Sequence, residues 1–546
     1  MVDGGVGVGS WDDLVGSALL GTERRRPVGV VGDAEEAAVA LLDAAASGVV
    51  RRRAGVRPGV AGERPPVAPA DRRPELPEAA RRRLGMLLVD RTADAARGRR
   101  GSAPNLAELL PQWLAAARRE GFAAPPALLP ALLDAARART DLRADALALA
   151  GPRGLWLAAL NADWKFALRA GQGAVQATDG DVRTLWEEGL FAERIALLTR
   201  LRLADPAAAL ALLDGSWRTE RAEDRLMFLD ALRTGLSAAD EEFLEQALSD
   251  RSRNVRTTAA ELLSALPRSA LAARMAERAR SCVSLGPDGI TVEAPYACDP
   301  AMERDGVAAK APSGRGERAW WLGQLVDSAP LSAWPDRFGG RSPEEIVALP
   351  VLDDWQSDLH AAWCRAAVRQ RDAGWARALL GPPPKPAAPV TAVGDPAKLL
   401  SVLPAAERAE WVARFIAANG LSEAFQMLGV CAVPWTRPLG RAVVDALDIA
   451  REGGSYPWSF SGVMGLAERC LDPDAVEQVA VLSAAAEEPP DGSPGASTYW
   501  SEAFQRLTGT MRLRAVMLAE LRGTPPGDGN PGTAGTPGIP GAPGTP

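Results

Sequence analysis

A single histidine limits the catalytic chemistry that this sequence can support. His360 lies four residues before Cys364 in the segment LDDWQSDLHAAWCRAA, so a helix would place both side chains on one face. A cysteine and a histidine at this spacing can form an activated thiolate or supply two metal ligands. Leu359 and Trp363 alternate with them, however, and an isolated cysteine usually behaves as a small buried hydrophobe. We expect His360 and Cys364 to be packing residues, and keep an enzyme that uses both as an alternative.

Other catalytic and cofactor-binding motifs are absent from the sequence. It has no GxxxxGKS or GxxxxGKT phosphate loop, and its five cysteines include no CxxC pair: Cys282, Cys298, Cys364, Cys431 and Cys470. Their wide spacing argues against a disulfide framework or a zinc site and indicates a reducing compartment. We predict no catalytic residues, cofactor or metal. No apolar run approaches the ~18 residues of a membrane helix, so we expect a cytoplasmic protein without a membrane span.

The charge balance restricts the kinds of partner. The chain has 62 basic and 69 acidic residues, a net charge of −7. Proteins that bind nucleic acid over a broad surface are usually basic, so any contact with phosphates must be local. Nucleic-acid binding in the manner of HEAT-like DNA-repair glycosylases is therefore a second alternative, and an acidic balance argues against it.

Two proline-rich segments divide the chain. Residues 56–77 and 381–396 are rich in proline, which fixes φ and disfavours helix in the preceding residue, so both are predicted to be linkers. They separate three predicted helical parts: an N-terminal segment (1–55), a helical-repeat domain (78–380) and a C-terminal domain (397–522).

The C-terminal residues 523–546 have a different composition. From Gly529 onward glycine recurs at every third position, as in collagen, with proline frequent between. Because the glycine triplets are few, we predict a disordered Gly/Pro-rich tail and not a triple helix.

Between the linkers, apolar residues recur at helical spacing. Phe191 to Leu203 forms one amphipathic stripe, and Asp205 followed by Pro206 predicts the start of the next helix. In residues 240–266, two apolar stripes flank the polar turn DRSRN. Neither helix can bury its stripe alone, so this hairpin must stack on neighbours, as in a helical solenoid.

Residues 283–295 depart from the helical pattern. β-prone residues flank Pro287-Asp288-Gly289, which is a turn signal, and so predict a small inserted β-hairpin. It would be either a contact arm or a packed loop that covers the end of the array.

Two clusters are candidates for partner binding. The segment WLAALNADWKF offers aromatic rings and a polar group, although core packing is the simpler account: Trp156, Asn161 and Trp164. Arginines at the start of the second helix of the 240–266 hairpin could bind an acidic segment or a phosphate: Arg251, Arg253 and Arg256.

The hairpin at 240–266 resembles a HEAT repeat. Asp250 ends the first helix, Val255-Arg256 follows, and the small residues Ala259 and Ala260 come where the helices would approach. The resemblance implies that Arg256 pairs with a carboxylate of the Asp250 type. Together with WDDLVGSALLGTERR and GPRGLWLAALNADWKF, the hairpin resembles an uncharacterised, mainly actinobacterial family, a domain of unknown function, over most of the chain up to Leu521.

That resemblance implies a genomic neighbourhood but no reaction. Members of the family are typically encoded beside SWIM zinc-finger proteins, MoxR-type AAA ATPases and von Willebrand A domain proteins, which are therefore the expected partners. The predicted fold class is all-α: a HEAT-like α-solenoid of stacked helical hairpins with a small β-hairpin insertion. The predicted function is a non-enzymatic scaffold or adaptor that binds protein partners.

Overall fold

The computed structural model describes residues 11–26, 33–53, 65–93, 106–171, 179–382, 395–484 and 494–523. The chain divides into two compact units, Met1–Ala68 and Pro69–Pro546. The predicted tail from 524 onward, and residues 56–64 and 383–394 of the two predicted linkers, lie outside the described part of the chain.

The first unit contains a pair of helices, α1 (Trp11–Leu20) and α2 (Ala34–Arg53), which contact each other. Gly48 of α2 lies against the indole of Trp11, because a methyl group at Gly48 would come within 3.3 Å of the ring. Asp33 caps α2 by accepting hydrogen bonds from the N–H groups of Glu35 and Glu36 at 3.0 and 2.9 Å. The short side chain at position 48 therefore sets how closely the helices pack.

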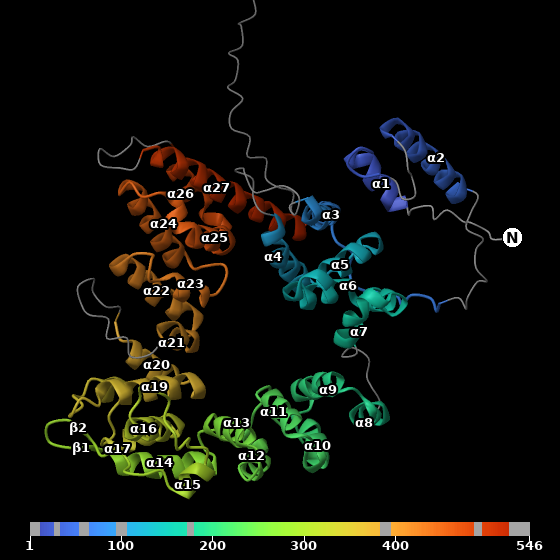
Figure 1. Cartoon of the computed structure of the whole chain (residues 1–546). Coiled ribbons are helices and arrows are strands. Elements are labelled where there is room, and N and C mark those ends of the chain that lie inside the picture. The colour runs from blue at the N-terminus through green and yellow to red at the C-terminus, as the bar shows by residue number, and fades with distance from the viewer. Residues whose placement is uncertain are drawn as a thin grey trace, which may run out of the picture. The chain divides into compact units, whose positions relative to one another are not determined.

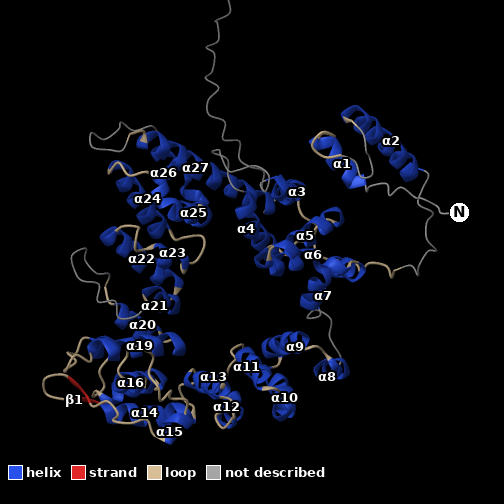
Figure 2. Cartoon of the chain, in the orientation of Figure 1, coloured by secondary structure: helices blue, strands red, loops and turns tan. Residues whose placement is uncertain are grey.

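The described part of the second unit is helical apart from one pair of short strands (Figures 1 and 2). Its first helices are α3 (Glu78–Ala93), α4 (Leu106–Arg119), α5 (Leu129–Ala138), α6 (Arg143–Leu160), α7 (Lys165–Gly171), α8 (Asp179–Glu188), α9 (Phe191–Ala204), α10 (Pro206–Ser216), α11 (Ala222–Ala231), α12 (Glu241–Ala247), α13 (Arg253–Ser264) and α14 (Ala270–Cys282). After the strands follow α15 (Pro300–Arg304), α16 (Glu317–Ser328), α17 (Ala333–Arg337), α18 (Pro343–Val347), α19 (Gln356–Gln370), α20 (Ala373–Leu380), α21 (Pro396–Val402), α22 (Ala405–Asn419), α23 (Phe425–Gly429), α24 (Arg437–Glu452), α25 (Ser461–Cys470), α26 (Val476–Leu482) and α27 (Ala496–Leu521). A search of the described residues finds no helix with the length and apolar character to cross a membrane.

Local side chains determine where several helices begin. Asp205 accepts a hydrogen bond from the N–H of Ala208 at 3.0 Å, and Pro206 is the first residue of α10, as the sequence predicts. Before α12, the N–H of Ser237 donates to the carboxylate of Asp240 at 2.9 Å within a capping box. Each cap gives a partner to a main-chain N–H that the helix itself leaves unbonded.

The helix hairpin predicted at 240–266 is present as α12 and α13. Arg256 was predicted to pair with a carboxylate of the Asp250 type, but among the described residues it bonds to main-chain carbonyls: its Nη1 donates to that of Asp250 at 2.8 Å. The Asp250 carboxylate itself pairs with Arg225 at 2.9 Å. Arg256 therefore stabilises the turn between the two helices, and Asp250 connects the hairpin to the preceding helix α11.

The sheet consists of β1 (Val283–Leu285) and β2 (Ile290–Val292), an antiparallel hairpin within the predicted segment. Val283 and Ile290 are fully buried, and the N–H of Ile290 donates to the carbonyl of Pro350 at 2.8 Å. The hairpin is thus packed into the helical core and is not a projecting arm.

The second unit has two large hydrophobic cores that share one helix. One core runs from Trp186 to Met511, and the other joins residues 76–150 to Met517 and Leu521. Helix α27 supplies residues to both and lies beside α3 and α4 (Figure 1). Helices α20 and α21, on either side of residues 383–394, contact each other, so residues 397–522 have no separate core.

Buried ion pairs link neighbouring helix pairs. The guanidinium of Arg202 on α9 forms two bonds with the Asp240 carboxylate, 2.7 and 2.8 Å long, and both side chains are only 1% exposed. Its other N–H groups donate to the carbonyls of Thr234, Gly235 and Pro206 at 2.9, 2.8 and 3.1 Å. All five N–H groups of Arg202 therefore have acceptors, which is what makes a buried charge tolerable.

Replacing Asp240 with asparagine should lower the free energy of unfolding by about 3–5 kcal/mol, because it leaves the buried charge of Arg202 without its counter-ion. The matched control is Asp445→Asn, at an exposed ion pair with Arg441 of 3.7 Å, which should change stability by less than about 0.5 kcal/mol. Urea denaturation followed by circular dichroism measures both. Equal effects at the two positions would contradict the assigned role of Asp240.

Candidate functional site

The structure places His360 and Cys364 in the core. Both are buried on α19, and the His360 ring contacts that of Trp363 with centroids 5.6 Å apart. Burial lowers the pKa of His360 and raises the pKa of Cys364 to about 12. Both shifts favour the neutral forms, whereas a nucleophilic pair needs the thiolate and the imidazolium. The geometry therefore supports the packing interpretation of these two residues.

Burial also raises the pKa of the remaining cysteines. Cys282, Cys431 and Cys470 are buried, and burial raises the pKa of Cys431 to about 11. Among the residues that the structure describes, no three His, Cys, Asp or Glu side chains are grouped so that they could hold a metal ion.

The first predicted partner-binding cluster consists largely of packing and capping residues. Trp164 is 9% exposed, and its indole N–H donates to the Asp134 carboxylate at 3.0 Å. Asn161 accepts from the N–H of Asp163 at 3.0 Å and caps the following turn. Trp156 is half-buried on α6. The three residues lie within one short stretch, but they do not form a common exposed surface.

The second predicted cluster is more accessible. Arg251 and Arg253 are exposed at the turn before α13, while Arg256 is half-buried and bonded to the main chain as described above. The exposed pair is therefore available for an acidic group, but neither arginine lines a pocket described in the structure.

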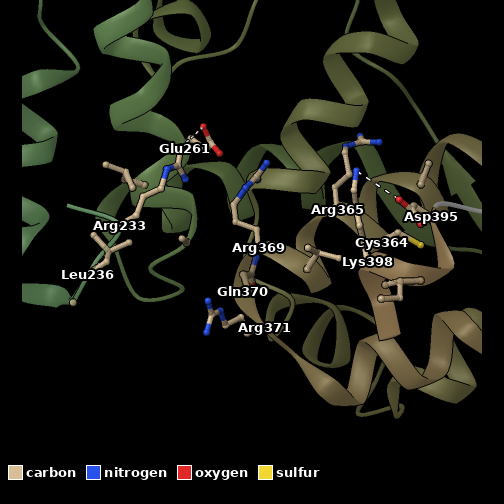
Figure 3. Close-up of a pocket in the computed structure, with 16 residues that line it drawn as sticks. Arg233, Leu236, Glu261, Cys364, Arg365, Arg369, Gln370, Arg371, Asp395 and Lys398 are labelled. Atoms are coloured by element: carbon tan, nitrogen blue, oxygen red, sulfur yellow. Dashed lines mark ion pairs between the residues drawn. The ribbon is translucent and has the colours of Figure 1, made fainter. Parts of the chain in front are cut away.

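A larger concave site lies between α13 and the loop after α11 on one side and α19 and α21 on the other. The cleft has a volume of about 940 Å³. Its lining includes five cations, Arg233, Arg365, Arg369, Arg371 and Lys398, and two carboxylates, Glu261 and Asp395. Figure 3 shows Arg369, Gln370 and Arg371 between the Arg233–Glu261 side and the Lys398–Asp395 side. We call this site the basic cleft.

Ion pairs fix part of the positive charge of the basic cleft. Arg365 and Arg369 both pair with Asp327 of α16, at 3.0 and 2.8 Å, so one carboxylate orients two guanidinium groups. Arg233 pairs with Asp230 at 2.7 Å and with Glu261 at 3.0 Å, and Lys398 pairs more loosely with Asp395 at 3.8 Å. The five cations therefore exceed the four carboxylates that pair with them by one, which leaves a small local excess of positive charge.

Arg371 is an exposed cation of the cleft and has an unusual backbone. It ends α19 in the left-handed region, with φ 53° and ψ 41°, where its N–H bonds to the carbonyls of the last turn. Glycine is the usual residue at such a position, because any side chain there is strained. No ion pair within the described residues involves Arg371, so its guanidinium is available to a ligand.

A family model described as a family of unknown function (DUF5691) matches residues 13–521. The chain is a member of DUF5691. No curated protein matches the sequence, and no solved structure matches it. DUF5691 membership confirms the predicted resemblance to an uncharacterised domain family.

Sequence reasoning did not find the basic cleft of this DUF5691 protein. Its residues come from segments far apart in the chain, Arg233 to Lys398, and no local motif connects them. The one local signal is the run VRQRDAGW, in which arginines crowd the end of α19 and a non-glycine residue ends the helix.

The single histidine makes a clear pH experiment possible. The folded pKa of His360 lies below the ordinary 6.5, so below pH 6.5 the unfolded state binds the proton first and stability is lost as the pH falls. The variant His360→Leu should lack this loss, so the wild-type free energy of unfolding should fall relative to the variant between about pH 7 and 5. Urea titrations at several pH values measure it. Parallel curves for the two proteins would show that His360 is accessible and normally titrating.

Proposed function

We propose that this DUF5691 protein is a non-enzymatic helical scaffold whose basic cleft binds an acidic segment of a partner protein. The observation that carries the proposal is the concentration of arginines in one concave site of an otherwise acidic chain. Guanidinium groups bind carboxylates through two parallel hydrogen bonds, and arginine is enriched at protein interfaces.

Rigid positioning supports a binding role for the cleft. Asp327 holds Arg365 and Arg369 in place from α16, and α16 packs against α19. A ligand would meet side chains whose conformational freedom is already restricted, which reduces the entropy cost of binding. The volume of about 940 Å³ suits an extended peptide segment of several residues.

We further propose that the helices between α9 and α22 form a HEAT-like solenoid. Arginine–carboxylate pairs 25 to 38 residues apart recur along these helices: Arg225–Asp250, Arg202–Asp240, Arg274–Asp305, Arg365–Asp327 and Arg377–Glu407. In a repeat protein each unit contacts mainly its neighbours in sequence, and contacts over such separations support this arrangement.

The partner classes implied by the family resemblance remain the first to test. An AAA ATPase, a SWIM zinc-finger protein or a von Willebrand A domain protein would be bound through an exposed acidic segment. Nucleic acid is the second candidate, because arginine also binds phosphate, although Glu261 and Asp395 in the cleft would repel it.

Charge reversal in the cleft should weaken binding of an acidic probe. We expect Arg371→Glu combined with Lys398→Glu to reduce affinity for a fluorescein-labelled decaglutamate peptide at least about tenfold, because like charges then face each other. The control is Arg414→Glu with Arg437→Glu, which makes the same change in net charge at exposed positions outside the cleft. Fluorescence anisotropy at about 0.15 M salt measures both.

Two results would contradict the proposal. One is equal weakening by the two double variants, since this would mean that net charge alone is sensed. The other is stronger binding of a duplex DNA than of the peptide, with a steep dependence on salt, which would favour the nucleic-acid alternative.

The variant Arg371→Gly should change the stability of the fold and the affinity for the acidic probe in opposite directions. Glycine relieves the left-handed strain, so the free energy of unfolding should rise by about 1 kcal/mol, while loss of the guanidinium should weaken binding of the decaglutamate probe. Thermal unfolding and anisotropy on the same sample give both values. A less stable variant would show that the Arg371 side chain makes a structural contact that outweighs its strain.

A further inference from the structure

A second pocket lies where α4 and α27 meet the loops that precede α24 and follow α25. Its volume is about 250 Å³. Leu109, Trp113 and Met517 are among the apolar residues that line it, and its polar lining residues are Gln112, Arg119 and Arg514. The lining contains two cations and no carboxylate.

Arg514 is a buried cation whose hydrogen bonds are incomplete. It is 6% exposed, and its Nε donates to Oε1 of Gln112 at 3.1 Å. Its Nη1 donates to the carbonyls of Glu468 and Leu471 at 3.3 and 2.6 Å. An arginine has five N–H donors, so the two on Nη2 have no acceptor among the residues that the structure describes. Arg514 lines the pocket, so these two donors are the ones left for a ligand there.

The carboxylates near Arg514 are committed to other groups. Glu468 pairs with Arg506 at 2.8 Å, and Glu108 pairs with Arg469 at 3.5 Å. Asp472 accepts from the N–H of Asp474 at 3.1 Å as a helix cap. Burial lowers the pKa of Arg514, because desolvation of its charged form outweighs the opposing effects of Cys470 and Asp472, and Asp472 forms no ion pair with it among the described residues. In contrast, the buried guanidinium of Arg202 forms an ion pair with Asp240.

Gln112 holds the guanidinium in its orientation. Its Oε1 accepts a hydrogen bond from Arg514, and its Nε2 donates to the carbonyl of Arg469 at 2.6 Å. Both the oxygen and the nitrogen of the amide are therefore hydrogen-bonded. Arg119 lies on the same wall with its Nε bonded to the carbonyl of Ala115 at 3.3 Å, and its remaining donors are exposed. The pocket thus combines an oriented buried cation, a second cation nearer to solvent and apolar walls.

We propose that this pocket binds a small organic carboxylate, with its charged group on Nη2 of Arg514 and its apolar body against Leu109, Trp113 and Met517. The volume equals that of roughly eight waters, at about 30 Å³ each, which admits a compact acid and excludes a long chain. A carboxylate matches the planar donor face of a guanidinium better than a neutral group does. The site is separate from the basic cleft and does not depend on its function.

The experiment uses the full chain with ¹³C-labelled methionine methyl groups, because Met517 lines the pocket and reports on it directly. Phenylacetate is the probe, and phenylacetamide is its neutral counterpart of the same shape. Met517→Leu assigns the resonance. We expect phenylacetate to shift the Met517 signal and to bind at least about tenfold more tightly than the amide.

Two variants separate the site from the fold. Arg514→Lys keeps a positive charge but loses the planar pair of donors, so it should weaken phenylacetate binding while the amide is unaffected. Ala115→Leu places extra volume in the pocket while Arg514 is kept, and it should block both compounds. Its control is Ala159→Leu, at an exposed position of α6, which should bind like the wild type.

The proposal fails if phenylacetamide binds as tightly as phenylacetate, since the buried cation would then contribute nothing. It also fails if Ala115→Leu binds phenylacetate normally while its circular dichroism spectrum is native, because the ligand would then lie elsewhere. The proposal also fails if about 10 mM phenylacetate, roughly ten times a Kd of 1 mM, causes no shift of the Met517 signal.

Discussion

The second unit depends on one helix, α27, that must be buried along its whole length. Its 26 residues span about 39 Å, and its inward side chains, from Trp500 through Leu507 to Leu521, recur every three or four positions. The first part of the helix belongs to the core that begins at Trp186, and the last turns belong to the core built from residues 76–150. The ion pair between Arg83 and Glu520, at 2.7 Å, and the Arg514 contacts fix the crossing of α27 with α3 and α4. The small pocket lies at this crossing, where α27 passes from one core to the other.

Arginine provides most of the polar connections inside this structure. Arg202 has a full set of acceptors with a carboxylate, Arg365 and Arg369 share one carboxylate, and Arg514 has carbonyls and an amide only. A buried guanidinium without a counter-ion is costly, so these three arrangements differ in how much stabilisation an added anion would bring. We therefore expect no anion to bind at Arg202, and we expect a bound anion to give the largest stabilisation at Arg514.

The sequence predicts what local patterns determine and misses what the folded chain assembles. The hairpin of α12 and α13, the cap at Asp205 and the β-hairpin at 283–295 follow from residue spacing, turn residues and short-range hydrogen bonds. The acceptor of Arg256 is a main-chain carbonyl and not a carboxylate of the Asp250 type, and residue spacing does not distinguish these two kinds of acceptor. The basic cleft brings together helices from the middle of the second unit, and the Arg514 pocket brings together helices near its two ends. Arg233 and Lys398, or Gln112 and Arg514, share no local signal. The proline-rich segment before α21 predicts a domain boundary, yet the core continues across it because α20 and α21 pack together.

The net charge of −7 would by itself argue against a partner that is acidic. Charges are screened over about 8 Å at physiological ionic strength, however, so a segment inside the basic cleft responds to the cations that line it and hardly to the acidic surface elsewhere. Because of the same screening, the cations of the cleft do not attract an acidic partner from a distance and do not increase its association rate. In the proposed function, recognition in the cleft would therefore come from short-range contacts, and those contacts would need Arg365 and Arg369 to be already in place. Asp327 satisfies that requirement: it lowers the net positive charge of the site but fixes the two guanidinium groups where a carboxylate can reach them.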